Sequence, residues 1–148
     1  MQLKNVLFLI IFSIAVCPAK SKNLKSFKWK IKNKIVGTLL VPSGYKLHNN
    51  YYGEGIFTSL SYKDSSEIFL HFGGDISLPI VRDDIIVNDS VSNKCGKGRK
   101  GLLKNKNLYW REDNHPCLIN IGYLDVHPEM KIEFEKSIDS FQTSVRCN

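Results

Sequence analysis

An apolar run near the N-terminus determines which part of this chain we expect to form the folded domain. Residues 6–16 are apolar except for Ser13, and Lys4 precedes them. Eleven residues suit the hydrophobic core of a secretory signal peptide and are too few to span a bilayer, which takes about 20. The small residue Ala19 closes the run. We therefore expect a signal peptide at residues 1–19, with cleavage after Ala19.

Two other outcomes at this leader stay open. Cleavage after Ala15 also satisfies the small-residue rule and leaves Cys17 in the mature chain. Lipid attachment at Cys17 is the other, although Val16 is bulkier than the residue normally found beside a lipidated cysteine. In each case we expect the protein to be exported, to the periplasm or outside the cell. We do not expect it to span a membrane after cleavage.

The rest of the chain has the size of one domain. Removal of residues 1–19 leaves 129 of the 148 residues, and single domains commonly have about 100–150. No second long apolar run, linker or internal repeat follows. We therefore expect a single domain over residues 20–148.

Alternation of apolar and polar residues predicts that most of this domain is β-strand. Phe27, Trp29 and Ile31 alternate with lysines, as in a strand with one buried and one solvated face. A second strand, at residues 35–41, is expected to continue from it through a bend at Gly37. Further strands are expected at residues 56–62 and 67–72, joined as a hairpin. A second antiparallel pair is expected at residues 108–111 and 117–124, joined by a loop at residues 112–116.

The period of the apolar residues changes near the C-terminus. Met130, Phe134, Ile138, Phe141 and Val145 recur at spacings of three or four, which places them on one face of a helix. The expected fold is therefore α+β, a mostly antiparallel β-sheet with a C-terminal amphipathic helix packed on one face.

Three cysteines remain after a cut at Ala19, namely Cys95, Cys117 and Cys147. In an oxidising compartment two of them can form a disulfide and leave one thiol. We consider the pairs Cys95–Cys117 and Cys95–Cys147, either of which would stabilise the fold by about 3–4 kcal/mol through loop entropy. Retention of Cys17 would permit two bridges, and buried thiols without any bridge are the remaining alternative.

The net charge of +7 is concentrated in two segments. Residues 20–34 hold seven lysines and residues 94–106 hold six basic residues, and neither segment contains an acid. Basic patches attract lipid headgroups, polyanionic glycans, nucleic acid or acidic proteins. The candidate anion-binding residues are Lys28, Lys30, Lys32, Lys97, Arg99 and Lys100.

The concentration of lysine can also arise without any binding role. The basic segments could face the acidic remainder of the same molecule or of a second copy. Lysines along one side of a strand also discourage edge-to-edge aggregation. A coding bias toward A/T would enrich Lys, Asn and Ile together without selection for binding.

The segment from Gly96 to Gly101 matches the pattern G-x-G-x-x-G. The dinucleotide-binding interpretation needs a strand before the motif and a helix after it. Residues 91–95 make a poor strand, and an apparent strand follows the motif with little room for a helix. We therefore expect a flexible basic loop and no nucleotide cofactor. An anion nest built from the glycine N–H groups is the alternative.

No motif predicts catalysis or metal binding. The four histidines form no H-E-x-x-H, and no Cys/His pair has zinc-finger spacing. His71 is expected to be a half-buried strand residue. We assign no catalytic residue, metal ligand or cofactor. The alternative is a secreted basic hydrolase, such as a nuclease, that uses His115 with Glu112 and Arg111 for general acid–base chemistry.

Two short motifs carry a resemblance to known proteins. One is the segment Val41-Pro42-Ser43-Gly44-Tyr45, a strand that runs into a turn, and the other is Phe134 with Ile138-Asp139-Ser140-Phe141. Together they resemble the PsbP/Mog1-like group of small exported α/β domains. The resemblance implies a sheet sandwiched by helices and a non-enzymatic accessory role. The middle of the chain, with its cysteine and basic glycine segment, departs from that pattern.

These observations predict a small exported binding or accessory protein without catalysis. Its expected contact is an anionic surface or an acidic protein, made through residues 20–34 and 94–106. An alternative of the same class is an extracytoplasmic immunity or inhibitor protein that blocks a toxin, in which the acidic surface is the contact face.

Overall fold

The computed structural model describes residues 23–53, 55–73, 85–93, 96–104 and 106–146. The expected signal peptide lies outside these residues, as do Cys95 and Cys147. Within the described ranges the chain is mostly antiparallel β-sheet with one C-terminal α-helix, so the predicted α+β class is confirmed. No helix in these ranges has the length and apolar character of a membrane span.

The strands form two sheets. The first has the order β1–β2–β10 and consists of β1 (Leu24–Ile31), β2 (Lys34–Pro42) and β10 (Gln142–Thr143). The second has the order β3–β4–β5–β9–β8–β7–β6. Its strands are β3 (Lys46–Tyr52), β4 (Gly55–Ser61), β5 (Glu67–Phe72), β6 (Ile85–Asn93), β7 (Gly96–Leu103), β8 (Tyr109–His115) and β9 (Ile119–Val126). A 3-10 turn, η1 (Pro128–Met130), leads into α1 (Lys131–Asp139).

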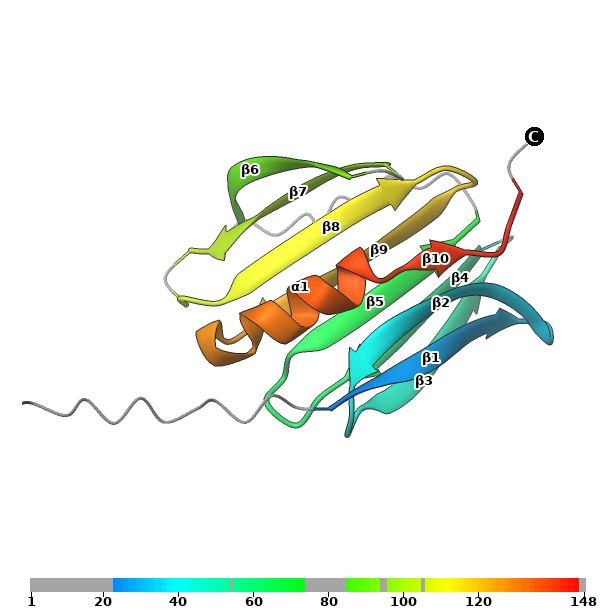
Figure 1. Ribbon diagram of the computed structural model, residues 1–148, viewed down its shortest axis with the longest axis horizontal. Helices are drawn as coiled ribbons and strands as arrows, with labels where there is room; N and C mark the ends of the chain where they lie inside the picture. Colours follow the sequence, from blue (N-terminus) through cyan, green and yellow to red (C-terminus); the bar gives the residue numbers. More distant parts are fainter. Residues whose placement is uncertain (1–22, 54, 74–84, 94–95, 105, 147–148) are drawn as a thin grey trace, which may run out of the picture.

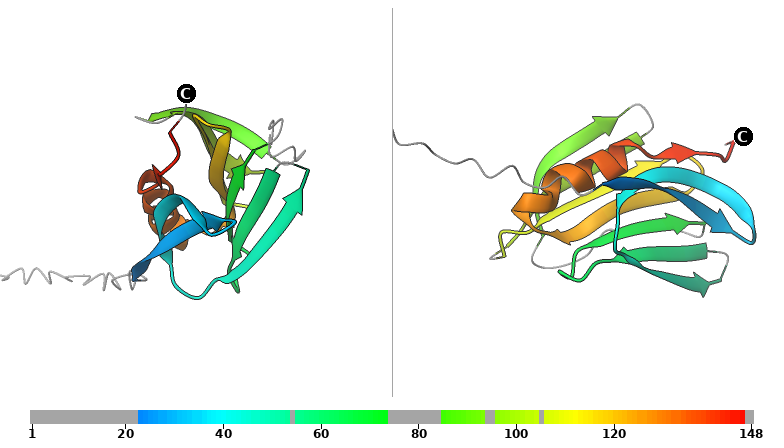
Figure 2. Two further views of the ribbon diagram at one scale, coloured as in Figure 1. Left: turned by 90° about the vertical axis from the view of Figure 1, so that its right-hand side faces the viewer. Right: turned by 60° about the horizontal axis from the view of Figure 1, so that its bottom comes forward.

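The core lies between two layers. The helix α1 and the three-stranded sheet lie side by side over one face of the seven-stranded sheet (Figures 1 and 2). Apolar side chains from both layers fill the space, among them Leu39, Leu60 and Phe134. Trp29 joins the layers with a hydrogen bond as well. Its Nε1 donates to Thr58 Oγ1 at 2.9 Å, so β1 is tied to β4.

The first two strands form a hairpin rather than one bent strand. Lys32 and Asn33 have φ angles of 45° and 68°, as a two-residue type I′ turn requires, and they join β1 to β2. The predicted continuity of the two strands is therefore wrong, although the β1–β2 register does shift beside Gly37, between Trp29 and Lys30. The alternation predicted for β1 is confirmed, since Trp29 is 1% exposed whereas the lysines on either side of it are exposed.

The C-terminal helix packs on the core as expected but is shorter than the apolar spacing predicts. It ends at Asp139, so Phe141 and Val145 follow it instead of continuing its face. Gln142 pairs with Thr38 of β2, which adds β10 to the first sheet. Phe141 packs over Gly37, where a Cβ would overlap its ring. Pairing with β2 thus takes precedence over another helical turn.

Among the remaining predictions, the two hairpins are confirmed. Strands β4 and β5 pair, and so do β8 and β9, although β8 extends through His115 into the predicted loop. The prediction of a flexible loop at Gly96–Gly101 is wrong, because these residues belong to β7. Gly98 passes so close to the backbone of Glu112 and the side chain of Asp113 that a Cβ would clash with both. Glycine therefore allows this strand to pair.

Candidate functional site

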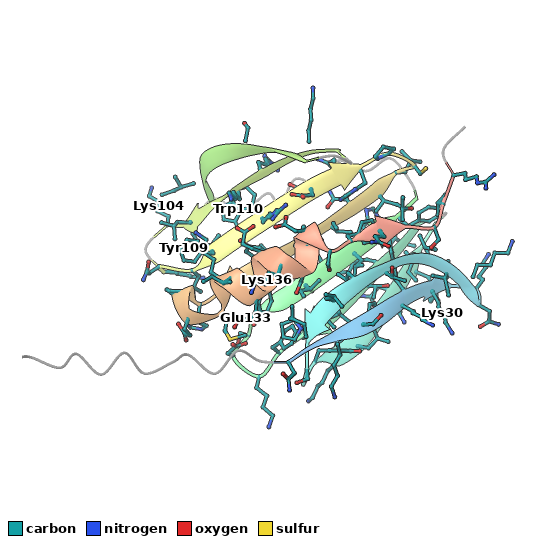
Figure 3. All side chains as sticks on the ribbon, in the orientation of Figure 1. Lys30, Lys104, Tyr109, Trp110, Glu133 and Lys136 are labelled. Carbon is teal, nitrogen blue, oxygen red and sulfur yellow. The ribbon has the colours of Figure 1, made fainter. Side chains whose placement is uncertain are left out.

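The first basic segment forms an exposed surface on the β1–β2 hairpin. Lys28, Lys30, Lys32 and Lys34, which we call the lysine face, are all exposed. None of the four takes part in an ion pair within the described residues. The cause is the strand alternation, which buries the aromatic side chains of β1 and turns Lys28 and Lys30 to solvent. Figure 3 shows Lys30 beside the β1–β2 hairpin, at one end of the molecule.

Two apolar side chains accompany these lysines. Ile35 lies opposite Lys30, and Leu40 lies opposite Ser26 in the β1–β2 register. Ile35 is 41% exposed and Leu40 is 42% exposed. Because residues directly opposite one another share a face of the sheet, Ile35 and Leu40 lie on the face that carries Lys28 and Lys30. Lys32 lies in the turn of the hairpin, and Lys34 lies opposite Ile31.

The second basic segment lies inside a sheet, and acids hold two of its cations. Arg99 donates from Nε and Nη2 to Glu112 Oε2 at 3.1 and 2.8 Å. The other oxygen of Glu112 accepts a 2.7 Å hydrogen bond from Asn120 Nδ2. Glu112 is 2% exposed, so its charge is compensated within the fold. Lys100 lies 3.6 Å from Glu135 of α1, on the other face of β7.

Beside this segment lies a buried charge network centred on Arg111. Its guanidinium donates from Nε and Nη2 to Asp113 at 2.9 and 2.8 Å, lies 2.8 Å from Asp139, and contacts Glu135. Burial alone lowers the pKa of Arg111, but the hydrogen bonds and charges of these acids outweigh it and raise that pKa. Tyr123 donates to Glu135 at 2.9 Å, and burial followed by the Glu135 charge raises the pKa of Tyr123. The network fastens α1 to β8.

The six candidate anion-binding residues do not form one surface. Lys28, Lys30 and Lys32 belong to the β1–β2 hairpin, and the other three belong to β7 in the second sheet. Figure 3 shows Lys30 and Lys104, one from each basic segment, at opposite ends of the molecule. Lys97 is exposed, whereas Arg99 and Lys100 are paired with acids.

The residues of the hydrolase alternative do not converge either. Arg111 and His115 lie on the side of β8 that faces α1, whereas Glu112 contacts Arg99 and Asn120 on the opposite side. His115 is buried with its ring centroid 5.0 Å from that of Phe141, and its Nε2 has no hydrogen-bond partner in the described part of the chain. Burial lowers the pKa of His115, although the charge of Asp113 opposes that shift.

His71 is more buried than expected. It is 1% exposed and stacks on Tyr52 with a centroid distance of 5.2 Å. Neither ring nitrogen has a hydrogen-bond partner in the ranges that the structure describes, and burial lowers the pKa of the imidazole. We find no functional arrangement around it among those residues.

The glycine motif has no nucleotide-binding geometry. Gly96–Leu103 is a strand between β6 and β8, without the turn and helix that would hold a phosphate. Among the described residues, no group of three or more His, Cys, Asp or Glu side chains could hold a metal ion.

Sequence reasoning missed the charge network around Arg111. The signal for the network was spacing, because Arg111 and Asp113 share a strand face and Glu135 and Asp139 are four apart on a helix. That these two faces meet depends on tertiary packing, which the spacing does not reveal.

No protein family, curated protein or solved structure matched this chain. The resemblance to the PsbP/Mog1-like group therefore stays a prediction.

Proposed function

We propose that this protein is a small exported binding or accessory protein without catalytic activity, and that it contacts an anionic surface through the lysine face. The apolar run at residues 6–16 supports export. The composition and exposure of the β1–β2 hairpin support the contact. The second basic segment is not part of the proposed surface.

One observation carries this proposal, namely four exposed lysines that have no acid partner among the described residues. A lysine near an anionic lipid surface contributes about 1 kcal/mol, so four contribute about 4 kcal/mol. Ile35 and Leu40 add apolar surface on the sheet face that carries Lys28 and Lys30. Charge next to exposed apolar groups suits a lipid interface, where headgroups and acyl chains meet. We therefore favour anionic lipid headgroups as the source of the negative charge.

Vesicle binding tests the proposal. The chain from Lys20 onward retains every described element and would be mixed with phosphatidylglycerol-containing vesicles in a sedimentation assay. Replacement of Lys28, Lys30, Lys32 and Lys34 by Gln should weaken binding about a thousandfold, since each cation contributes about 1 kcal/mol. Binding of the unsubstituted chain should also fall steeply as salt is raised from about 50 to about 500 mM, as screened charges require.

A matched control removes the same charge elsewhere. Lys63, Lys97, Lys104 and Lys136 are exposed, and their replacement by Gln changes the net charge equally but should leave most of the binding intact. Equal loss in both quadruple variants would show that net charge alone drives binding and would overturn the proposed site. Binding to poly-glutamate but not to vesicles would replace the lipid surface with an acidic protein.

No specific observation among the described residues favours either alternative function. The inhibitor alternative uses an acidic contact face, but Glu112 and Asp113 are buried and Glu135 is engaged by Arg111. The hydrolase alternative needs Glu112, Arg111 and His115 in one pocket, and they lie on two sides of β8.

We further propose that Cys117 takes part in a disulfide. Its sulfur lies 4.0 Å from the carbonyl oxygen of Val145, two residues before Cys147. The β7–β8 register pairs Lys97 with Asn114, so the start of β7 lies near the turn that carries Cys117. Peptide mapping under non-reducing conditions should find Cys117 joined to Cys95 or Cys147. A Cys95–Cys147 bridge would contradict the proposal.

A further inference from the structure

A cavity of about 250 Å³ lies where the start of α1 meets β7 and β8, far from the lysine face. Figure 3 shows Tyr109 beside the beginning of the helix, with Lys30 at the other end of the molecule. Cationic, aromatic and aliphatic side chains line the cavity. Those that bear on binding are Lys100, Leu102, Tyr109, Tyr123, Lys131 and Glu135.

Lys131 supplies the cavity with a positive charge. It is the first residue of α1, where the helix dipole disfavours a cation. It forms no ion pair within the described residues, and its ammonium nitrogen instead lies 4.1 Å from the centre of the Tyr109 ring. A cation in this position weakens the helix slightly, so helix stability does not explain it.

The carboxylate that lines the cavity is already engaged. Glu135 contacts Arg111, accepts the 2.9 Å hydrogen bond from Tyr123, and lies 3.6 Å from Lys100. These three donors satisfy its negative charge. The charge left for a ligand is positive and comes from Lys131, since Lys100 is paired with Glu135.

We propose that this cavity binds a small aromatic carboxylate, with the carboxylate at Lys131 and the ring against Leu102 and Tyr109. The volume is below the range of about 300–1,000 Å³ that suits drug-sized ligands, so it fits a compound of one or two rings. A carboxylate gains a charge-assisted hydrogen bond from the ammonium group. The site shares no residue with the lysine face, so it stands or falls independently of the proposed membrane contact.

Isothermal titration with 2-naphthoate tests this site in the chain from Lys20 onward. We expect one-to-one binding that Lys131→Gln weakens about tenfold or more, the usual effect of losing a hydrogen bond to a charged group. Lys136→Gln is the matched control, because Lys136 is exposed on the same helix, does not line the cavity, and should leave affinity unchanged.

Two further measurements separate this site from non-specific binding. The neutral analogue 2-naphthalenemethanol should bind about tenfold more weakly than 2-naphthoate, because it lacks the charge. Leu102→Trp, which fills the cavity, should abolish binding while circular dichroism shows an unchanged fold. Failure of 2-naphthoate to bind, equal affinities of the Lys131→Gln and Lys136→Gln variants, or equal binding of the alcohol would each overturn the proposal.

Discussion

The two basic segments of this protein sit in opposite structural environments. Strand β1 is at the edge of its sheet, and its lysines face solvent without an ion pair to any described residue. Strand β7 lies between two other strands, and acids meet it from both sides. Glu112 holds Arg99 on one face, and Glu135 of α1 holds Lys100 on the other.

The difference shows that a run of cations in a sequence does not by itself mark a binding surface. In β1 the alternation with Trp29 assigns every second position to the core and leaves the lysines in solvent. In β7, Arg99 compensates the carboxylate of Glu112, which would otherwise be buried without a cation at a high cost. Substitutions should therefore change stability in the β7 region and change binding in the β1 region.

The largest expected effect comes from Arg111→Leu. This change leaves Asp113 buried without its guanidinium partner and should lower the free energy of unfolding by about 3–5 kcal/mol. Urea denaturation measures it. The double variant Arg111→Leu/Asp113→Leu should recover part of the loss, because it removes both charges. A loss below about 1 kcal/mol would mean that the network contributes little to stability. It would contradict the proposed difference between the β7 region and β1.

The next effect comes from Arg99→Met, which leaves the buried carboxylate of Glu112 with Asn120 as its remaining hydrogen-bond donor in the described residues. We expect a loss of about 1–3 kcal/mol, the cost of an unsatisfied buried group. Lys97→Met, two residues away on the same strand and exposed, should change stability by less than about 0.5 kcal/mol. Urea denaturation measures both variants. Equal losses of stability would contradict the structural role of Arg99 as the partner of buried Glu112.

A smaller effect should appear with pH, through His71. Burial lowers its pKa in the folded state, whereas the unfolded chain titrates near about 6.5. The unfolded state therefore binds more protons than the folded state below about pH 6.5. The free energy of unfolding is unaffected by His71 above that pH and declines as the pH falls below it. The slope is at most about 1.4 kcal/mol per pH unit for one histidine. His71→Phe should reduce the slope between about pH 7.5 and 5, measured by thermal unfolding, and an unchanged slope would rule out this source.

The smallest effect on stability should come from the lysine face. Replacement of Lys28, Lys30, Lys32 and Lys34 by Gln removes no ion pair seen in the described residues, so stability should change by less than about 0.5 kcal/mol. Reduced repulsion between neighbouring cations would make the variant slightly more stable at low salt. Urea denaturation at two salt concentrations checks both points. A loss above about 1 kcal/mol would place these lysines in the same structural role as Arg99.

Much of the fold could be predicted because its signals are local. The alternation around Trp29 predicted β1, and the spacing of Phe134 and Ile138 predicted the buried face of α1. Strand β3 was missed because all of its residues are exposed, so its sequence lacks alternation. The end of α1 was misplaced because Gln142 finds a pairing partner in β2, which no local pattern encodes.

The basic glycine segment of β7 was harder to interpret than the apolar patterns. Gly98 indicated a loop, since glycine is uncommon in strands, but it makes room for Asp113 on the neighbouring strand. The sequence showed cations near residues 94–106 but not that Arg99 and Lys100 are compensated by Glu112 and Glu135. Those pairings join elements that are distant in the sequence, so only the folded chain reveals them.

The placement of β10 has a consequence for the order in which the protein is assembled. The hydroxyl of Thr143 donates a hydrogen bond to the carbonyl oxygen of Val36, 107 positions earlier. Gln142 pairs with Thr38 and so completes the sheet that covers the core. Contacts of such long range form slowly, and this one cannot form during synthesis until residue 143 has left the ribosome. The sheet that covers the core is therefore completed only when the end of the chain has been synthesised.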